Sequence, residues 1–240
     1  FHGLSGNSFP VIVASGTSSS ILHYSKNRNL IKKGGLVLVD AGGEYEGYAS
    51  DITRTFPVNK RFSNRQRQIY AIVLQANEQC IQMIRPGISL KELQDEAVHV
   101  IIDGLIKMNI LKGDPEKIKS KKTHALFFPH GVSHSLGLDV HDVFVREKKR
   151  KNPPCLRADF ILKEGHVITV EPGIYFIQPL LTDKKLRKKH AELVNWKKAL
   201  NFLDFGGIRI EDDVLVTKNS RRVLTRVPKT ISEIESLRSR

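Results

Sequence analysis

Four acidic side chains stand inside or at the end of short apolar segments, where acidic residues are uncommon. They are Asp40 after residues 36–39, Asp51 within residues 48–53, Glu171 after residues 167–170, and Glu211 within residues 207–211. A turn would explain Asp40 alone, and an exposed strand position would explain Asp51 alone. A buried carboxylate is costly unless it is paired or metal-bound. Four such acids predict a shared site, whose charge two divalent cations would balance.

Two histidines can add a nitrogen ligand to this oxygen-rich set. His130 and His134 have the spacing of an HxxxH motif. The glycine between them, and the lack of a glutamate after His130, argue against a zinc-binding helix. A lone histidine is more often structural than a ligand. One histidine with four carboxylates suits Mn²⁺, Co²⁺ or Mg²⁺ at least as well as Zn²⁺.

Strand periodicity places other side chains beside two of these acids. Residues two apart in a strand point to the same face. Arg209 therefore shares a face with Glu211, and Thr169 shares one with Glu171. An arginine beside a ligand carboxylate can orient it, so Arg209 is a candidate positioning residue.

The elements that carry these residues follow from the hydrophobic pattern. Short β-branched segments predict strands at residues 9–14, 36–39, 48–56, 167–170 and 208–216, the second and third forming a hairpin. Capping boxes at 63–66 and 89–92 predict the starts of two amphipathic helices. The pattern of residues 180–203 predicts a charged helix, and Thr230 is expected to cap a last short helix. Grouped strands with helices between the groups predict an α+β fold, with helices on one face of the sheet.

Composition narrows the class of protein. The chain has 240 residues and 40% hydrophobic content, which supports one large folded domain rather than disorder. No apolar run approaches the roughly 18 residues that a membrane helix needs. Cys80 and Cys155 are too few for a disulfide framework, which favours a reducing compartment. We expect the cytoplasm, with the mitochondrion as the alternative.

The net charge of +14 raises the question of an anionic partner. The excess lies in three short clusters, residues 117–122, 146–151 and 184–189. Each cluster interrupts a patterned region, so we interpret all three as solvated surface. Nucleic acid is therefore not the expected partner, although an added RNA or membrane-surface role and a purely non-catalytic binding module stay open as alternatives.

Taken together, the motifs resemble those of the pita-bread dinuclear metallopeptidases, the family of prolidase, aminopeptidase P and methionine aminopeptidase. The matching runs, in the family's order, are Asp40-Ala-Gly-Gly, Ser50-Asp51-Ile-Thr-Arg-Thr-Phe-Pro57, His130-Gly-Val-Ser-His134, Val140-His141-Asp142, Val170-Glu171-Pro-Gly-Ile-Tyr175 and Gly207-Ile-Arg-Ile-Glu-Asp212. The resemblance implies a curved antiparallel sheet covered by helices. Residues 1–240 would then be the catalytic domain, without its first helices and without the N-terminal domain of proline-specific members.

The resemblance also implies a role for each matching residue. Five residues would bind two divalent metal ions, with Mn²⁺ expected first and Co²⁺ or Zn²⁺ as alternatives: Asp40, Asp51, His134, Glu171 and Glu211. The expected catalytic residues are His141, Glu171 and His23. The expected substrate-binding residues are His23, His141, Arg157, Arg209 and Phe9. His130 would lie near the site without being a ligand.

The motifs are typical of the proline-specific branch, and three features resemble eukaryotic prolidase: residues 127–130, the insert 176–205, and the ending 224–230. In prolidases an arginine at the position of Arg157 holds the dipeptide carboxylate; the plainer interpretation is surface charge. We expect hydrolysis of Xaa-Pro dipeptides by a hydroxide between two metal ions. The alternative is an aminopeptidase P, which removes the N-terminal residue before proline from longer peptides. We expect a homodimer in the full-length protein and no membrane association.

Overall fold

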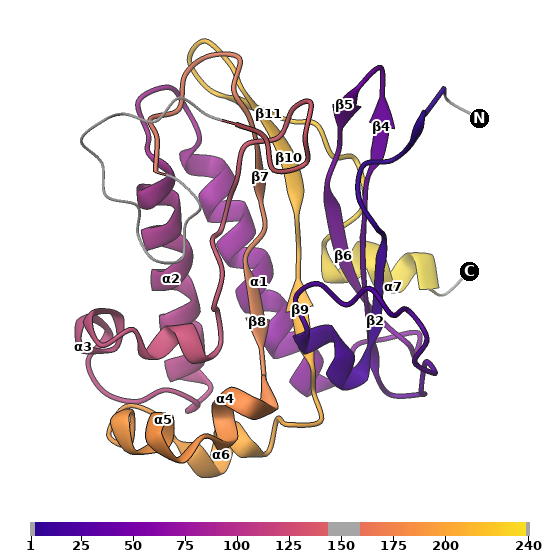
Figure 1. Ribbon diagram of the computed structural model, residues 1–240. Coiled ribbons are helices and arrows are strands. Elements are labelled where there is room, and N and C mark those ends of the chain that lie inside the picture. Colours follow the sequence, from indigo (N-terminus) through magenta and orange to yellow (C-terminus); the bar gives the residue numbers. More distant parts are fainter. Residues whose placement is uncertain (1–2, 144–158, 239–240) are drawn as a thin grey trace.

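The computed structural model describes residues 3–143 and 159–238. The first sheet is antiparallel, in the order β2 (Ile12–Ser15), β3 (Leu36–Ala41) and β6 (Ile52–Pro57). A small arm of β1 (Gly6–Asn7), β4 (Gly43–Tyr45) and β5 (Tyr48–Ala49) extends from it (Figure 1). The predicted hairpin is confirmed, because β3 pairs with β6 along its length. The predicted strand 48–56 is interrupted at Ser50 and Asp51, so it forms two strands.

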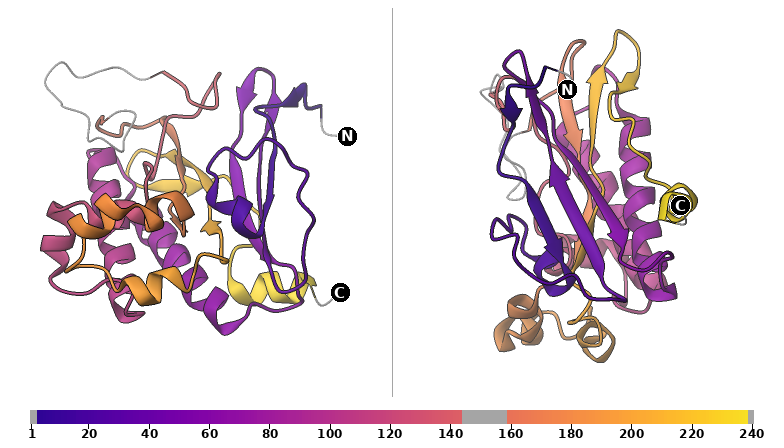
Figure 2. Two further views of the ribbon diagram at one scale, coloured as in Figure 1. Left: turned by 60° about the horizontal axis from the view of Figure 1, so that its bottom comes forward. Right: turned by 90° about the vertical axis from the view of Figure 1, so that its right-hand side faces the viewer.

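Two long helices, α1 (Asn64–Met83) and α2 (Leu90–Lys107), cover one side of the strands (Figure 2). Both predicted capping boxes are present, at Ser63 with Gln66 and at Ser89 with Glu92. Each box satisfies backbone N–H groups that have no partner within the first turn. The buried faces of α1 and α2 form a large part of the main apolar core, and α1 packs against strands of the C-terminal half of the chain.

The C-terminal half supplies a second set of antiparallel strands. Three pair in the order β11 (Arg221–Val223), β10 (Asp212–Val216) and β7 (Val167–Val170), and β8 (Gly173–Tyr175) pairs with β9 (Gly207–Arg209). Helix α7 (Ile231–Arg238) follows and packs against α1, and Thr230 precedes it as predicted. Antiparallel strands covered by helices match the predicted α+β architecture. No helix in the described ranges is long and apolar enough to cross a membrane.

Besides the strand 48–56, two further predicted elements are wrong in their continuity. Residues 180–203 do not form one helix but are divided among α4 (Gln178–Thr182), α5 (Lys184–Lys189), α6 (Trp196–Leu200) and the turns between them. Asp183 and Asn195 cause the breaks, because their side chains accept from backbone N–H groups and start new helices. Residues 208–216 divide into β9 and β10 because the Glu211 N–H donates to the Thr53 carbonyl, outside strand pairing.

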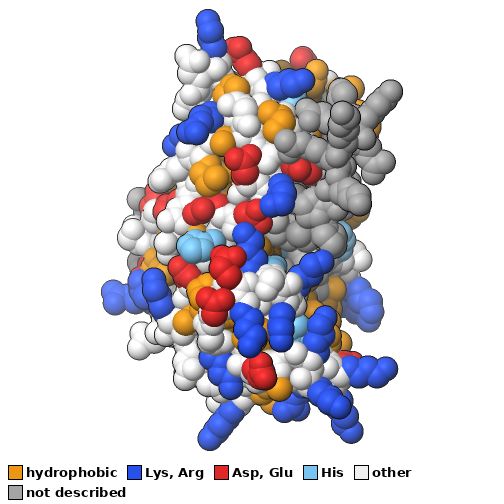
Figure 3. Space-filling view, turned by 90° about the vertical axis from the view of Figure 1, so that its left-hand side faces the viewer, with side chains coloured by type: hydrophobic (Ala, Val, Ile, Leu, Met, Phe, Trp, Pro, Cys, Tyr) orange, Lys and Arg blue, Asp and Glu red, His pale blue; other side chains and the backbone are white. Residues whose placement is uncertain are grey.

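Two of the basic clusters lie on short surface helices at the lower end of the molecule in Figure 1. Residues 117–122 include part of α3 (Pro115–Ser120), and residues 184–189 are α5. Acidic side chains lie among the basic ones on this face (Figure 3), and Lys117 and Lys119 pair with Glu192 and Asp95 at 3.3 and 3.2 Å. This mixed charge is typical of a solvated surface. The cluster 146–151 lies outside the described residues. Two single-turn 3₁₀ helices, Gly16–Ser20 and Thr123–Leu126, complete the fold.

Candidate metal centre

A cavity of about 600 Å³ opens where the two sets of strands meet. Every candidate site residue within the described ranges lines it: Phe9, His23, Asp40, Asp51, His130, His134, His141, Glu171, Arg209 and Glu211. Arg157, the remaining candidate, lies outside the described residues. The sequence motifs, which extend from Asp40 to Asp212, therefore converge on one site.

Three of the four carboxylates stand where strands are interrupted. Asp51 lies between β5 and β6, Glu171 between β7 and β8, and Glu211 between β9 and β10. Asp40 lies within β3, opposite Thr53 of β6. An interruption frees the backbone from regular pairing and lets a side chain turn into the cavity. This geometry is the physical reason for acidic residues inside otherwise apolar segments.

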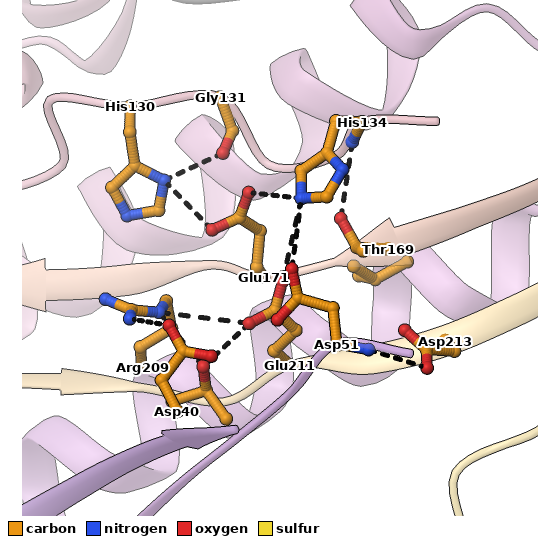
Figure 4. Close-up of polar contacts among 12 residues, drawn as sticks. Asp40, Asp51, His130, Gly131, His134, Thr169, Glu171, Arg209, Glu211 and Asp213 are labelled. Atoms are coloured by element: carbon orange, nitrogen blue, oxygen red, sulfur yellow. Dashed lines mark hydrogen bonds and ion pairs between the residues drawn. The ribbon is translucent and has the colours of Figure 1, made fainter. Parts of the chain in front are cut away.

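His134 faces three of the carboxylates, as the dashed lines in Figure 4 show. Its Nε2 lies 3.6 Å from both Asp51 Oδ2 and Glu171 Oε1, and 4.0 Å from Glu211 Oε1. The ligand atoms of Asp51, His134 and Glu211 all lie within 4.8 Å of one another, and all three residues are buried. Such separations suit atoms that share a metal ion rather than atoms that bond to each other directly.

The His134 ring is held in a form that can bind a metal. Its Nδ1 lies 3.0 Å from the Ser135 carbonyl oxygen, so Nδ1 carries the proton and donates. Nε2 is then the acceptor that faces the acids. The His134 backbone N–H donates to Thr169 Oγ1 at 3.3 Å. Thr169 therefore positions the histidine, whereas strand parity placed it beside Glu171.

The electrostatics of the acids favour a bound cation or proton among them. Burial, and then the charges of Asp40 and Glu171, raise the pKa of Asp51 from 3.8 to about 9. Burial, and then Asp51 and Glu171, raise the pKa of Glu211 well above its ordinary value. The buried Oδ1 atoms of Asp40 and Asp51 have no hydrogen-bond partner among the described residues. A hard divalent cation fits this donor set, because it would satisfy these oxygens and offset the repulsion.

Arg209 connects both ends of the acidic cluster. Its Nη2 donates to Asp40 Oδ2 at 2.6 Å. Its Nε donates to Thr53 Oγ1 at 3.2 Å, and the Thr53 hydroxyl donates to Glu211 Oε2 at 2.7 Å. Arg209 itself is 4.0 Å from Glu211 Oε2. The predicted neighbour of Glu211 thus contacts Asp40 directly and reaches Glu211 mainly through Thr53, which the sequence analysis did not identify.

Tyr175 is another residue that the sequence analysis missed. Its hydroxyl accepts from Arg209 Nη1 at 3.0 Å and lies 2.8 Å from His130 Nε2. His130 Nδ1 lies 2.8 Å from the Gly131 carbonyl, so Nδ1 donates there and Nε2 accepts from Tyr175. Burial, and then the positive charge of Arg209, lower the pKa of His130 to about 3. His130 is therefore neutral, and both of its ring nitrogens are engaged, by the Gly131 carbonyl and by the Tyr175 hydroxyl.

Asp213 supports the site from behind. Its Oδ2 accepts from the Asp51 backbone N–H at 3.1 Å, and burial raises its pKa to about 7. The sequence contained a signal for it, because Asp212 and Asp213 follow Glu211 in an apolar segment.

His23 and His141 are exposed at the cavity, and the rings of His141 and His134 lie 4.4 Å apart.

Comparison with known proteins agrees with this geometry. The sequence profile of metallopeptidase family M24 matches residues 1–218. A protein named probable Xaa-Pro aminopeptidase pepP from Botryotinia fuckeliana is 44% identical, over 98% of this chain and 52% of its own. Xaa-Pro aminopeptidase of Escherichia coli is 43% identical, over 98% of this chain and 48% of its own.

Solved structures give the same result. Zinc-substituted E. coli aminopeptidase P in complex with product superposes with a TM-score of 0.83 at 42% identity, covering 99% of this chain and 49% of that one. The predicted pita-bread fold and proline-specific branch are confirmed. Prolidase as the nearest relative is not confirmed, because these relatives are Xaa-Pro aminopeptidases. The chain spans about half the length of the relatives it matches. It belongs to metallopeptidase family M24.

Proposed function

We propose that this protein is a metal-dependent Xaa-Pro aminopeptidase of the aminopeptidase P type, which removes the N-terminal residue before proline from peptides. The observation that carries the proposal is the buried group of Asp51, His134 and Glu211 beside the cavity. The Xaa-Pro aminopeptidases among the relatives support the choice of peptide bond. They favour this alternative over the dipeptidase that the sequence analysis expected first.

We propose that two divalent cations occupy the site, with Mn²⁺ as the first candidate and Co²⁺ or Zn²⁺ as alternatives. Asp40 and Asp51 would hold one cation, and His134 and Glu171 the other, with Asp51 and Glu211 shared between them. When bound, such cations polarise the carbonyl of the scissile bond and make a water molecule acidic near neutral pH. The oxygen-rich donors and the raised pKa of Asp51 support this assignment.

The remaining roles in the proposal belong to side chains along the cavity. Glu171 would accept the proton of the attacking water and deliver it to the imide nitrogen that leaves. His141 would donate a hydrogen bond to the oxyanion of the tetrahedral intermediate. His23 and Phe9 would enclose the proline ring, since both line the cavity. Arg209 would keep Asp40 and, through Thr53, Glu211 in place.

Some expectations concern the whole protein. A homodimer remains a proposal, and so does a role for Arg157 in holding a substrate carboxylate. A substrate carboxylate immediately after proline is present in a dipeptide and absent in a longer peptide. Arg157 therefore matters most for distinguishing the two activities.

Cleavage of Ala-Pro and Ala-Pro-Ala tests the proposal on the full chain. The chain is loaded with Mn²⁺, its metal content is measured after dialysis, and alanine release from both peptides is followed. We expect about two metal ions per chain and a higher kcat/KM for Ala-Pro-Ala. Glu211→Gln should be inactive, whereas Asp139→Asn, at an exposed position, should behave like the wild type. Cleavage of Ala-Pro alone would support the dipeptidase, and a metal-loaded chain without activity on either peptide would refute both.

A further inference from the structure

A buried ion-pair network lies behind the metal centre and does not line the cavity. Its centre is Asp212, which is 1% exposed and directly follows Glu211. Asp212 Oδ1 accepts from Arg54 Nη2 at 2.6 Å, and Oδ2 accepts from Lys229 Nζ at 2.7 Å. Both carboxylate oxygens of Asp212 are therefore satisfied by cations of the chain itself, which separates Asp212 from the metal-binding acids.

Arg54 links this network to the strand that carries Asp51. It is 3% exposed, and its Nη1 donates to the carbonyl oxygens of Glu211 at 2.7 Å and Thr53 at 2.9 Å. Its other donors reach the carbonyl oxygens of Val227 at 2.8 Å and Pro228 at 3.1 Å. A single guanidinium thus joins β6, the residue before β10 and the C-terminal segment.

Lys229 makes a second link, toward Glu171. Besides Asp212, its Nζ donates to Asn77 Oδ1 at 2.7 Å. The Asn77 amide in turn donates to the carbonyl of Val170, the residue before Glu171, at 2.9 Å. One ammonium group therefore touches the supports of two segments that carry ligand acids. The Lys229 backbone is itself fixed, because its carbonyl accepts from the Tyr70 hydroxyl at 2.7 Å.

We propose that Lys229 is a positioning residue for the metal centre. Its charge completes the buried pairing of Asp212, and through Asp212 and Asn77 it holds Glu211 and Glu171 at their places around the cavity. Lys229 lies beyond residues 1–218, the stretch that matches the family. The effect of Lys229 on catalysis rests on the proposed function, but its effect on the order of the segments 167–171 and 209–213 does not.

Removing the ammonium would leave Asp212 Oδ2 and Asn77 Oδ1 buried with one donor fewer each. Because unpaired buried polar atoms are costly, the segments around them should loosen. The loosening should be confined to residues 167–171 and 209–213, because the long helices α1 and α2 have their own apolar core.

Amide hydrogen exchange of the metal-free full chain tests this directly. In Lys229→Met, we expect exchange in peptides covering residues 167–171 and 209–213 to be about tenfold faster, with α2 unchanged. Lys229→Arg should restore protection, since a guanidinium can donate to both acceptors. Arg226→Met is the matched control, because it removes an exposed positive charge three residues away. Should Lys229→Met not fold, Lys229→Gln replaces it, and the same result is expected.

Titration with Mn²⁺ by calorimetry supplies the second measurement. We expect Lys229→Met to bind Mn²⁺ about 10-fold to 100-fold more weakly than the wild type, and Lys229→Arg to bind within a few-fold of it. Exchange that rises equally in α2 would overturn the proposal, because it would show a merely global loss of stability. The proposal would also be overturned if Lys229→Met showed the same amide exchange and the same Mn²⁺ affinity as the wild type. If the wild type itself bound no Mn²⁺, the proposed function would fail, while the exchange result would still decide the role of Lys229.

Discussion

Asp51→Asn should stabilise the metal-free protein while it removes metal binding. In the structure Asp51 is buried against other acids, and burial together with Asp40 and Glu171 raises its pKa from 3.8 to about 9. Asparagine has nearly the same shape but cannot ionise. The substitution therefore removes the free-energy cost of keeping this carboxyl protonated in the folded state, without opening a cavity, and it also removes one of the proposed metal ligands.

The magnitude and sign follow from linkage between protonation and folding. A pKa that is raised in the folded state contributes stability below the ordinary value of 3.8, and this stability is lost as the pH rises toward about 9. At pH 7 the loss is roughly 4 kcal/mol at most, because neighbouring acids titrate together with Asp51. Burying the new amide offsets part of the gain. We expect a net gain of about 1–3 kcal/mol, or roughly 3–10 °C in Tm.

Thermal unfolding of chelator-treated protein at pH 5 and pH 8 provides the assay. The advantage of Asp51→Asn should be larger at pH 8, and Asp139→Asn, at an exposed acid, should show none. Mn²⁺ at one hundred times its Kd should stabilise the wild type by about 2.7 kcal/mol and leave Asp51→Asn unchanged. A metal-free variant that is less stable than the wild type at pH 8 would refute the electrostatic reasoning.

Three further substitutions test other parts of the structure. Arg209→Lys keeps the positive charge but cannot reproduce the several hydrogen bonds of the guanidinium. Mn²⁺ affinity measured by calorimetry should therefore fall about 10-fold to 100-fold. An unchanged affinity would contradict the positioning role of Arg209. Gly42→Ala would place a Cβ 1.7 Å from the Ser50 carbonyl oxygen. Urea unfolding should therefore show a loss of about 3 kcal/mol in the free energy of unfolding. Gly6→Ala is the control, because its Cβ would have no atom within 4 Å. Arg157→Ala should change kcat/KM for Ala-Pro and Ala-Pro-Ala by similar factors, and a selective loss of about tenfold on Ala-Pro would restore the dipeptidase interpretation.

The sequence predicted the acids that line the cavity because each breaks a local rule. Asp51, Glu171 and Glu211 interrupt apolar segments, and such a conflict is visible within about five residues. The capping boxes of α1 and α2 were predictable for the same reason, since their partners are three residues apart. Local patterns therefore gave most elements and the composition of the site.

The contacts that orient these acids were not predictable in this way. Thr53 contacts Glu211 across 158 residues of sequence, and Tyr175 contacts Arg209 across 34. Both residues lie in runs that carry candidate ligands, but a threonine in a strand and a buried tyrosine are ordinary residues, so the local pattern did not indicate which distant side chains they contact. The single helix expected at 180–203 failed for a related reason. The helical periodicity holds over short stretches, but Asp183 and Asn195 act as N-caps that start new helices within the segment.

The expectation that acids inside apolar segments bind metal also selects too many residues, and Asp212 shows how a structural acid differs from a proposed metal ligand. Asp212 meets this sequence criterion as well as Glu211 does, yet Arg54 and Lys229 cover both of its oxygens. Within the described ranges, the ion pairs of Asp51 involve His134 alone, and one of its buried oxygens has no partner. Cations of the chain itself balance the charge of a buried acid such as Asp212. A buried acid such as Asp51, which has no lysine or arginine partner among the described residues, favours an external cation. For Asp212 and Asp51, the supply of neighbouring lysine and arginine groups, which only the fold determines, separates the structural acid from the proposed metal ligand.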